Sequence, residues 1–562
     1  MIIGIDLGTT NSLAAYFTED GPRIIPNRLG KRLTPSVVSM DEEEQIYVGD
    51  LAAERRLLYP DSAAAVFKRD MGSGKKFQLL HKSFTAEELS SFVLRALKED
   101  AENFLGEPVT EAVISVPAYF NDERRRATRR AGELAGLKVE RIISEPTAAA
   151  IAYGLYQSQG HMRFLVFDLG GGTFDVSVLE RIDNILEVRA VAGDNFLGGE
   201  DFTMVLEEMF FQKYPQFDRL KIDAKTLRHI HRQAENCKIG FADSRKSVME
   251  CKIQEERYSL SVDLAEYEKA CEELLDKIRQ PVRRSLSDAH IRLSDIDKVV
   301  LVGGATKSPV VRRFVSKLFR VIPDTNINPD EAVALGAAIQ GAMKERRDAI
   351  KEVILTDVCP FTLGTEVVRE WEKGIYENGV FCPIIERNTI IPASRTERLY
   401  TLRDDQTKIR VKVLQGESRF AGNNLFLGEL TIEVPKAKAG EEPVDVTYTY
   451  DINAILEVEV KVVSTGKSQK QIFGGKNSDM TPEEIADRFD TLSYLKIHPR
   501  DREENKYLLL LGERIYEESL GEKRQLIEGE LHKYEQALDS YESAVIDRAK
   551  EAFRDFLKEF EE

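Results

Sequence analysis

One short pattern occurs twice in this chain, and it constrains the fold more than any other feature. The stretch I-G-I-D-L-G-T-T-N-S runs from Ile3 to Ser12, and F-L-V-F-D-L-G-G-G-T-F-D runs from Phe164 to Asp175. Each places Asp-Leu-Gly directly after an apolar run that is typical of a buried strand. A surface turn would explain one copy equally well. Two copies indicate an internal repeat.

A third, similar stretch is V-V-L-V-G-G-A-T-K-S-P, from Val299 to Pro309. It again has a buried-strand pattern that ends in a pair of glycines. Between these loops, strand and helix patterns alternate. Ala112–Val116 predicts a strand that ends at Pro117, and the arginine-rich stretch from Asp122 to Ala135 predicts a helix. The first 345 residues are therefore expected to form an α/β domain.

The residues in these loops suit phosphate chemistry. Glycines without side chains let backbone N–H groups approach phosphate oxygens. Asp6 and Asp168 would repel a phosphate, so they imply a divalent cation, or its waters, between carboxylate and phosphate. Thr9, Thr10 and Thr173 supply hydroxyls to phosphate or water. We interpret the first loop as half of a nucleotide-phosphate clamp, and the segment from Asp168 as the other half.

Bulk properties exclude several classes of protein. The net charge of -17 disfavours generic binding to nucleic acid or to an anionic membrane, because both are polyanions. The cysteines are odd in number and form no C-x-x-C pair, which favours reduced thiols. No apolar run approaches the roughly 18 residues of a membrane span, and Asp6 stands where a secretory signal would be apolar. We expect a soluble cytoplasmic protein.

Two other motifs are rejected. G-S-G-K-K (Gly72–Lys76) looks like a phosphate-binding P-loop, but Arg69 occupies the position of its first glycine and Lys76 replaces its Ser or Thr. His229 and His231 suggest a metal pair, yet residues two apart on a helix face different directions. No zinc site is predicted.

Two changes of pattern divide the rest of the chain. From about Val358, the stretches Lys408–Val413 and Val444–Tyr450 alternate apolar and polar residues, which predicts half-buried antiparallel strands. Near Met480 the capping box T-P-E-E (Thr481–Glu484) carries proline at the first helical position and predicts a helical tail. At the end, apolar residues at helical spacing predict a face that packs on its own domain: Tyr541, Val545, Ala549, Phe553, Phe556 and Leu557.

Further motifs accompany these loops. They are V-P-A-Y-F-N-D (Val116–Asp122), E-P-T-A-A-A (Glu145–Ala150), L-G-G-E-D-F (Leu197–Phe202), N-P-D-E-A-V-A-L-G-A-A (Asn328–Ala338), V-I-L-T-D (Val353–Asp357) and V-L-Q-G-E (Val413–Glu417). In this order and together with the three glycine loops, they resemble the DnaK-type 70-kDa heat-shock chaperones. The compact lid and trimmed nucleotide domain are most similar to the HscC-like branch.

The resemblance implies an architecture and an activity. An actin-like ATPase domain with a duplicated RNase H-like fold would span residues 1–345, an interdomain linker 346–357, a β-sandwich that binds peptides 358–476, and a helical lid 477–562. The implied function is an ATP-dependent chaperone whose hydrolysis of ATP to ADP is coupled to its affinity for extended hydrophobic segments of unfolded proteins. Two alternative classes of protein share the phosphate loops: an actin-like small-molecule kinase and an ATP-dependent filament protein.

The resemblance also implies cofactors and partners. ATP or ADP and Mg²⁺ are expected, with K⁺ as a further candidate ion. The partners would be unfolded or extended polypeptides and a J-domain co-chaperone, and the need for a nucleotide-exchange factor stays open. Neither nucleic acid nor membrane is expected, and the chain is expected to be a monomer.

Site residues follow from the matched motifs. The catalytic group would be Lys68, Glu145, Asp168, Thr173 and Asp175, and the metal group Asp6, Asp168 and Glu145, mainly through water. Nucleotide would contact Gly8, Thr9, Thr10, Asn11, Gly170, Gly171, Gly172, Gly198, Gly199, Glu235, Lys238, Gly303, Gly304, Lys307 and Asp330. Allosteric coupling would use Pro117, Arg125, Val353, Ile354, Leu355 and Asp357. Peptide would contact Val368, Leu402, Ile409 and Val411.

Some positions depart from the family pattern. Lys307 replaces an arginine that usually stacks on adenine, and Ala242 replaces a serine, so weaker ATP binding is expected. Thr356 replaces a linker leucine and Thr365 a pocket isoleucine, so lid closure and substrate range are expected to differ. The segment between Lys68 and Pro117 is shorter than in the family, which puts dependence on a standard exchange factor in doubt.

Overall fold

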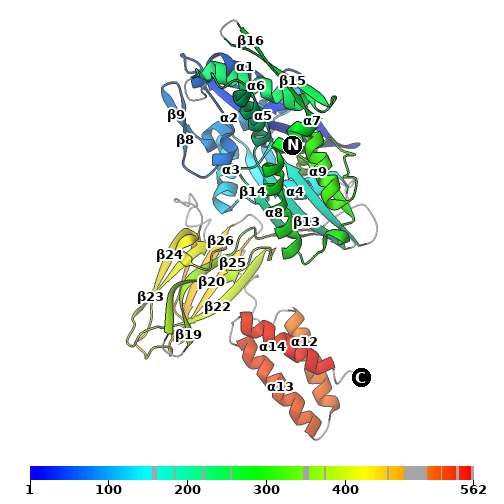
Figure 1. Cartoon of the computed structure of the whole chain (residues 1–562). Coiled ribbons are helices and arrows are strands. Elements are labelled where there is room, and N and C mark those ends of the chain that lie inside the picture. Colours follow the sequence, from blue (N-terminus) through cyan, green and yellow to red (C-terminus); the bar gives the residue numbers. More distant parts are fainter. Residues whose placement is uncertain are drawn as a thin grey trace. The chain divides into compact units, whose positions relative to one another are not determined.

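The computed structural model in Figure 1 describes most of the chain. The described residues are 1–154, 161–182, 185–217, 222–253, 256–345, 354–372, 375–451, 455–473, 503–519, 522–539 and 543–558. They form two compact units, Met1–Pro360 and Phe361–Glu562. Among these residues no helix is long and apolar enough to cross a membrane.

The first unit contains two mixed sheets with the same pattern of strand directions. In the first sheet, β1 pairs parallel with β10 and antiparallel with β2, which continues antiparallel to β3. In the second, β12 pairs parallel with β17 and antiparallel with β13, which continues antiparallel to β14. The internal repeat in the sequence therefore corresponds to two sheets with the same arrangement of strands. The strands are β1 (Ile2–Asp6), β2 (Asn11–Thr18), β3 (Gly21–Ile25), β10 (Glu111–Val116), β11 (Lys138–Ser144), β12 (Met162–Leu169), β13 (Phe174–Ile182), β14 (Ile185–Asp194), β17 (Lys298–Val302) and β18 (Ile354–Val358).

Helices pack on these sheets, and local sequence sets their ends. The N-terminus of α2 has a capping box made by Thr85 and Glu88, and its C-terminus ends at Gly106 with a left-handed φ of 73°. Asn121 caps α3, so the predicted arginine-rich helix is confirmed. The helices are α1 (Asp50–Leu58), α2 (Ala86–Leu105), α3 (Asp122–Leu134), α4 (Glu145–Ala152), α5 (Gly199–Lys213), α6 (Ala224–Gly240), α7 (Leu264–Ala270), α8 (Glu272–Asp288), α9 (Pro309–Phe319) and α10 (Ala332–Lys344).

Small residues let α10 pack closely against β1 and α4. A Cβ on Gly336 would lie 1.8 Å from the carbonyl oxygen of Ala148 in α4. A Cβ on Gly4 in β1 would lie 2.1 Å from the backbone nitrogen of Ala338. The alanine- and glycine-rich composition of α10 therefore serves close backbone packing. Shorter strands complete the unit: β4 (Thr34–Pro35), β5 (Val37–Met40), β6 (Ile46–Val48), β7 (Ala63–Ala65), β8 (Lys76–Leu79), β9 (Lys82–Thr85), β15 (Lys246–Ile253) and β16 (Glu256–Asp263).

The second unit begins with two antiparallel sheets of order β20-β19-β23-β24 and β22-β25-β26-β27. In β23, Lys408 and Arg410 are exposed while Val411 and Val413 are buried, so the predicted alternation is confirmed. The strands are β19 (Leu363–Glu372), β20 (Ile375–Ile385), β21 (Ile390–Ile391), β22 (Ala393–Tyr400), β23 (Lys408–Gln415), β24 (Leu425–Glu433), β25 (Pro443–Tyr450), β26 (Leu456–Val462) and β27 (Ser468–Phe473).

In the described part of the chain after β27, the helices are α12 (Glu503–Glu518), α13 (Glu522–Asp539) and α14 (Ser543–Lys558). Phe553 and Leu557 of α14 are buried with Ile527 and Tyr534 of α13, which confirms that this amphipathic face packs on its own helices. The capping box at Thr481–Glu484 and Tyr541 lie outside the described residues. The predicted fold class, α/β followed by an antiparallel sandwich and a short helical region, is confirmed.

Candidate nucleotide site

A cavity of about 500 Å³ lies in the first unit where the loops after β1, β12 and β17 converge. The three glycine loops, far apart in sequence, therefore share one wall. Most of the predicted nucleotide, metal and catalytic residues line it: Asp6, Gly8, Thr9, Thr10, Asn11, Lys68, Glu145, Asp168, Gly170, Gly171, Thr173, Gly199, Glu235, Lys238, Gly303, Gly304, Lys307 and Asp330. Gly172, Asp175 and Gly198 do not line it.

The two Asp-Leu-Gly loops contact each other directly, and glycine makes this contact sterically feasible. A Cβ on Gly171 would lie 1.6 Å from the Oγ1 of Thr10, and a Cβ on Gly172 would lie 2.4 Å from the Cγ2 of Thr9. Any larger residue would separate the loops. The two halves of the predicted clamp thus meet as one surface of backbone and hydroxyl groups.

Gly198 supports this surface from behind. A Cβ on Gly198 would lie 2.5 Å from the backbone nitrogen of Gly172. Arg69 donates from Nε to the carbonyl oxygen of Gly172 at 2.7 Å, and its Nη2 lies 2.9 Å from the carboxylate of Asp201. Asp201 also accepts the N–H of Gly198 at 2.7 Å. Sequence reasoning missed Arg69 as a supporting residue, although it directly follows the predicted Lys68.

A group of buried acids faces one lysine at the centre of the site. The Nζ of Lys68 lies 2.7 Å from Oε1 of Glu145, and both side chains are almost fully buried. Burial first, and the charge of Glu145 second, raises the pKa of Asp6 to about 7 and that of Asp175 to about 8. The same two causes raise the pKa of Asp168 well above its ordinary value. One lysine thus neutralises only part of the potential negative charge.

The residues present fit a hydrated divalent cation. The Oδ2 atom of Asp168 is buried and has no hydrogen-bond partner among the described residues. A cation there would pair this orphaned oxygen and relieve the repulsion between the carboxylates. No three His, Cys, Asp or Glu side chains of the described part converge closely enough to hold a metal directly. Contact through water therefore suits the donor set.

These raised pKa values predict how stability depends on pH without nucleotide or metal. A carboxyl with a raised pKa binds its proton more tightly when folded. Its stabilising contribution is complete below the ordinary value of 3.8 and is lost as the pH rises through about 7 for Asp6 and about 8 for Asp175. With chelator present, calorimetry should show the first unit unfolding at lower temperature as the pH rises from about 5 to about 8. Asp175→Asn should flatten this slope, and a rising unfolding temperature in wild type would contradict the assignment.

Other predicted nucleotide-contacting residues of the cavity are held by polar contacts. Lys238 donates to the carbonyl oxygen of Gly199 at 2.9 Å and to Oγ1 of Thr203 at 2.8 Å, and pairs with Glu235 at 2.7 Å. Lys307 forms an ion pair with Asp330. Ile239, which sequence reasoning did not single out, also lines the wall, as do Ala242 and His231.

Pro117 and Arg125, which are predicted to take part in allosteric coupling, lie next to the buried carboxylates. Arg125 is buried and donates to the carbonyl oxygens of Phe120 at 3.2 Å and Ala118 at 3.3 Å. Asp175 accepts the N–H of Tyr119 at 3.1 Å. The segment that begins at Pro117 is therefore held both by Arg125 and by a carboxylate beside the cavity.

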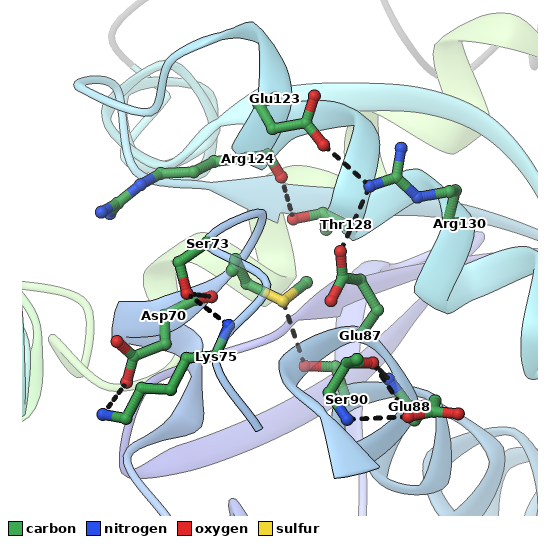
Figure 2. A network of polar contacts seen from close by, with 12 residues as sticks. Asp70, Ser73, Lys75, Glu87, Glu88, Ser90, Glu123, Arg124, Thr128 and Arg130 are labelled. Atoms are coloured by element: carbon green, nitrogen blue, oxygen red, sulfur yellow. Dashed lines mark hydrogen bonds and ion pairs between the residues drawn. The ribbon is translucent and has the colours of Figure 1, made fainter. Parts of the chain in front are cut away.

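Figure 2 shows how the loop after Lys68 is anchored. Arg130 of α3 forms ion pairs with Glu123 at 3.0 Å and with Glu87 of α2 at 3.2 Å. In the rejected P-loop motif, Lys75 pairs with Asp70 at 2.8 Å, outside the cavity. The motif is an exposed turn that joins η2 (Phe67–Asp70) to β8.

The described part of the predicted linker is a strand of the first unit. β18 pairs parallel with β14, with Ile354 opposite Ile185 and Leu355 opposite Leu186. Asp357 lies close enough to Arg141 for its charge to oppose the fall in the pKa of Arg141 that burial causes. Val353 lies outside the described residues.

The predicted peptide-binding residues lie in the second unit and differ in exposure. Leu402 is 53% exposed, and Val368 and Ile409 are partly buried. Val411 is only 1% exposed, so its side chain lies in the sandwich core. Thr365 is fully buried, and its Oγ1 has no hydrogen-bond partner among the described residues.

Known proteins match this chain along nearly its whole length. A family model described as "Hsp70 protein" matches residues 2–79 and 74–561. The chain is 40% identical over 490 residues to the chaperone protein DnaK of Thermotoga neapolitana, an alignment that covers 85% of this chain and 80% of the relative. The DnaK proteins of Thermotoga petrophila and Thermotoga maritima match with the same identity and coverage.

Proposed function

This chain belongs to the Hsp70 family and is an ATP-dependent chaperone, and from this premise we propose that its first unit binds magnesium-ATP in the cavity and hydrolyses it. DnaK-type relatives are ATPases as a class. One observation carries the proposal for this chain: two interlocking glycine loops face buried carboxylates and the buried ion pair of Lys68 with Glu145. ATP binding measured with and without Mg²⁺ tests it, because the orphaned Oδ2 of Asp168 predicts that affinity falls sharply without the metal.

In the proposed reaction, the chain's residues position the phosphates and the attacking water. Backbone and hydroxyl groups of Thr9, Thr10 and Asn11 would hold the phosphates. Lys68 would orient the water with Thr173 and Asp175, and its buried ion pair with Glu145 fixes its position. Mg²⁺, when bound through Asp6, Asp168 and Glu145, would supply positive charge beside the phosphates.

Coupling to the peptide site is proposed to run through the segment at Pro117. Asp175 and Arg125 hold that segment through backbone hydrogen bonds, so a change in the charge around Asp175 would alter it. The pairing of β18 with β14 offers a reversible contact for the linker. Any such coupling must be reciprocal, and it is typically worth about 1–3 kcal/mol.

The linker proposal predicts that Leu355→Asp combined with Asp357→Asn uncouples the units. The proposed docking of the apolar linker would require the introduced charge to be desolvated, at a cost of several kcal/mol, so pairing of β18 with β14 should be lost. Basal hydrolysis should survive, while acceleration by peptide should disappear. Leu526→Asp, at an exposed leucine, is the control for an added charge. Full acceleration by peptide in the double variant would refute the linker assignment.

The second unit is proposed to bind extended, aliphatic peptide segments at Ile409, with Val368 and Leu402 over the peptide. Ile409 is partly buried on the apolar face of β23, whereas its neighbour on that face, Val411, is fully buried. This difference supports Ile409 as the residue that a peptide side chain can reach. Val411 contributes through the core beneath it.

Ile409→Phe should therefore weaken the binding of leucine-rich peptides by roughly 1–3 kcal/mol, because the larger ring would fill the proposed pocket. Hydrolysis without peptide should not change. Val411→Phe is the matched control, since overpacking the core should lower the unfolding temperature of the second unit. Fluorescence anisotropy with a labelled peptide measures the effect. Unchanged affinity in a folded Ile409→Phe protein would place the groove elsewhere.

The remaining proposals rest on the family alone. DnaK-type chaperones act on substrate polypeptides and with J-domain co-chaperones, and we propose the same partner classes here. ADP as product, K⁺ as a further ion, a monomeric state and a cytoplasmic location are proposed on the same ground. Placement in the HscC-like branch stays a prediction. A small-molecule kinase or a filament protein is not favoured, because the family match extends through the sandwich and the helices.

A further inference from the structure

His231, one of the two histidines rejected above as a metal pair, lies between two carboxylates at the wall of the nucleotide cavity. It belongs to α6, and both carboxylates belong to α5, a helix that packs against α6 (Figure 1). Its Nε2 lies 3.3 Å from Oε1 of Glu200, and its Nδ1 contacts Oε1 of Glu207. His231 and Glu200 line the cavity, whereas Glu207 is only 1% exposed. One imidazole ring therefore joins two helices through both of its nitrogens.

This arrangement suits a positively charged ring. A neutral imidazole has one N–H donor and one lone pair, so it can donate to only one of two carboxylates. In the charged form both nitrogens donate, and each carboxylate accepts a charge-assisted hydrogen bond. When the ring loses a proton, the remaining N–H stays with Glu207, because a buried carboxylate loses more when a donor is removed. The lone pair on Nε2 then faces Glu200 and repels it.

Glu200 connects this histidine to the second glycine loop. Its backbone N–H donates to the carbonyl oxygen of Gly171 at 2.8 Å, and the N–H of Gly199 donates to the carbonyl oxygen of Gly170 at 2.8 Å. Lys238 of α6 holds the same turn, since it donates to the carbonyl oxygen of Gly199 at 2.9 Å. A displacement of Glu200 would therefore move the backbone of the loop that we propose binds phosphate.

Other charged groups surround this pair of helices. Arg56 of α1 interacts with Glu200 through its charge, and it stays charged at neutral pH because its pKa is lowered only to about 10. On the side of β15, His229 accepts the backbone N–H of Lys252 at 3.4 Å. Histidine is the side-chain type that ordinarily changes charge near neutral pH, so His231 supplies a variable charge between the two carboxylates. The remaining charged groups are Glu54 of α1 and Arg228, Arg232 and Glu235 of α6.

We propose that His231 is a positioning residue for the nucleotide. In its charged form it holds Glu200, and through Glu200 the second glycine loop, in the conformation that binds phosphate. The inference rests on the proposed function, because it concerns the same cavity. Nucleotide affinity should therefore fall as His231 loses its proton with rising pH. By linkage, bound nucleotide must favour the charged ring.

The experiment measures the affinity of the full chain for ADP, with Mg²⁺, from about pH 5.5 to about pH 8, a range in which histidine ordinarily titrates. The reference variant is His231→Arg, which carries a permanent charge and enough donors for both carboxylates. Comparison with this variant at each pH removes the titration of ADP itself and of Asp6 and Asp175, which both proteins share. We expect the wild type to weaken relative to His231→Arg by roughly tenfold as the pH rises, the scale of one charge-assisted hydrogen bond.

Three further variants identify the contact that matters. His231→Gln should bind ADP about tenfold more weakly than His231→Arg at every pH, because a neutral amide replaces the charged ring. Glu200→Gln should remove the pH-dependent loss, since its amide can donate to the lone pair on Nε2. His229→Gln is the matched control, because His229 is on the same helix but does not line the cavity, and it should follow the wild type. Melting curves show that each variant is folded.

The outcomes separate this inference from the proposed function. If the affinities of wild type and His231→Arg keep a constant ratio over the whole range, the inference is overturned while the proposed function stands. If folded His231→Gln binds ADP as tightly as His231→Arg and only its unfolding temperature is lower, His231 is a structural residue and the inference is again overturned. If wild type binds no ADP at any pH, the proposed function fails, and the inference fails with it.

Discussion

Lys68→Ala is expected to slow single-turnover hydrolysis of ATP by roughly two to three orders of magnitude, which is the usual cost of losing one preorganised polar group at a reacting phosphate. Lys68 lies in the cavity among buried carboxylates, and it is held by Glu145 at 2.7 Å. The alanine variant should still bind ATP, because the phosphate cradle consists mainly of backbone and threonine groups. Loss of rate with retained binding would identify Lys68 as a residue of the chemical step.

The variant also leaves Glu145 buried without its partner, which costs about 3–5 kcal/mol when a buried pair is broken. Calorimetry should therefore accompany the rate measurement, so that unfolding is not mistaken for loss of catalysis. Lys75→Ala is the matched control, since Lys75 is exposed and forms its ion pair with Asp70 on the turn that follows Lys68. A wild-type rate in a folded Lys68→Ala protein would remove Lys68 from the mechanism.

Gly198→Ala should abolish most ATP binding, although Gly198 does not line the cavity. Its φ of -171° is extended backbone that any residue can adopt, so the effect is purely steric. The added methyl group would lie 2.5 Å from the nitrogen of Gly172 and 2.6 Å from the carbonyl carbon of Gly171. Both are backbone atoms of the phosphate loop and cannot rotate away. Overpacking typically costs about 1–3 kcal/mol, and here that cost falls on the loop that we propose binds phosphate.

Equilibrium binding of ATP measures this loss. Gly529→Ala provides the matched control, because a Cβ at Gly529 meets open space. That variant should bind ATP as wild type does. An unchanged ATP affinity in Gly198→Ala would mean that the loop at Gly171 is not the phosphate site.

The sequence predicted the parts of the site that carry a local signature. Asp6 and Asp168 each follow an apolar run and precede a glycine, and the internal repeat that these runs indicated is matched by two sheets with the same strand directions. The alternation in Lys408–Val413 correctly separated exposed from buried positions. Such signals are visible because they repeat with a fixed period or a fixed spacing.

Other features depend on contacts between distant segments, and no local pattern encodes them. Arg69 supports Gly172 from a segment about a hundred positions earlier, and it entered the sequence analysis only as a defect in a P-loop motif. Val411 shares a strand face with Ile409, yet only packing in the sandwich shows that it is fully buried.

The central claim is that nucleotide chemistry in the first unit responds to peptide bound in the second. The most direct measurement is single-turnover hydrolysis of ATP by the purified full chain, with and without a leucine-rich extended peptide. The account predicts that saturating peptide accelerates hydrolysis roughly fivefold or more, in line with a coupling free energy of about 1–3 kcal/mol. Hydrolysis that proceeds at the same rate with and without a peptide that demonstrably binds would contradict it.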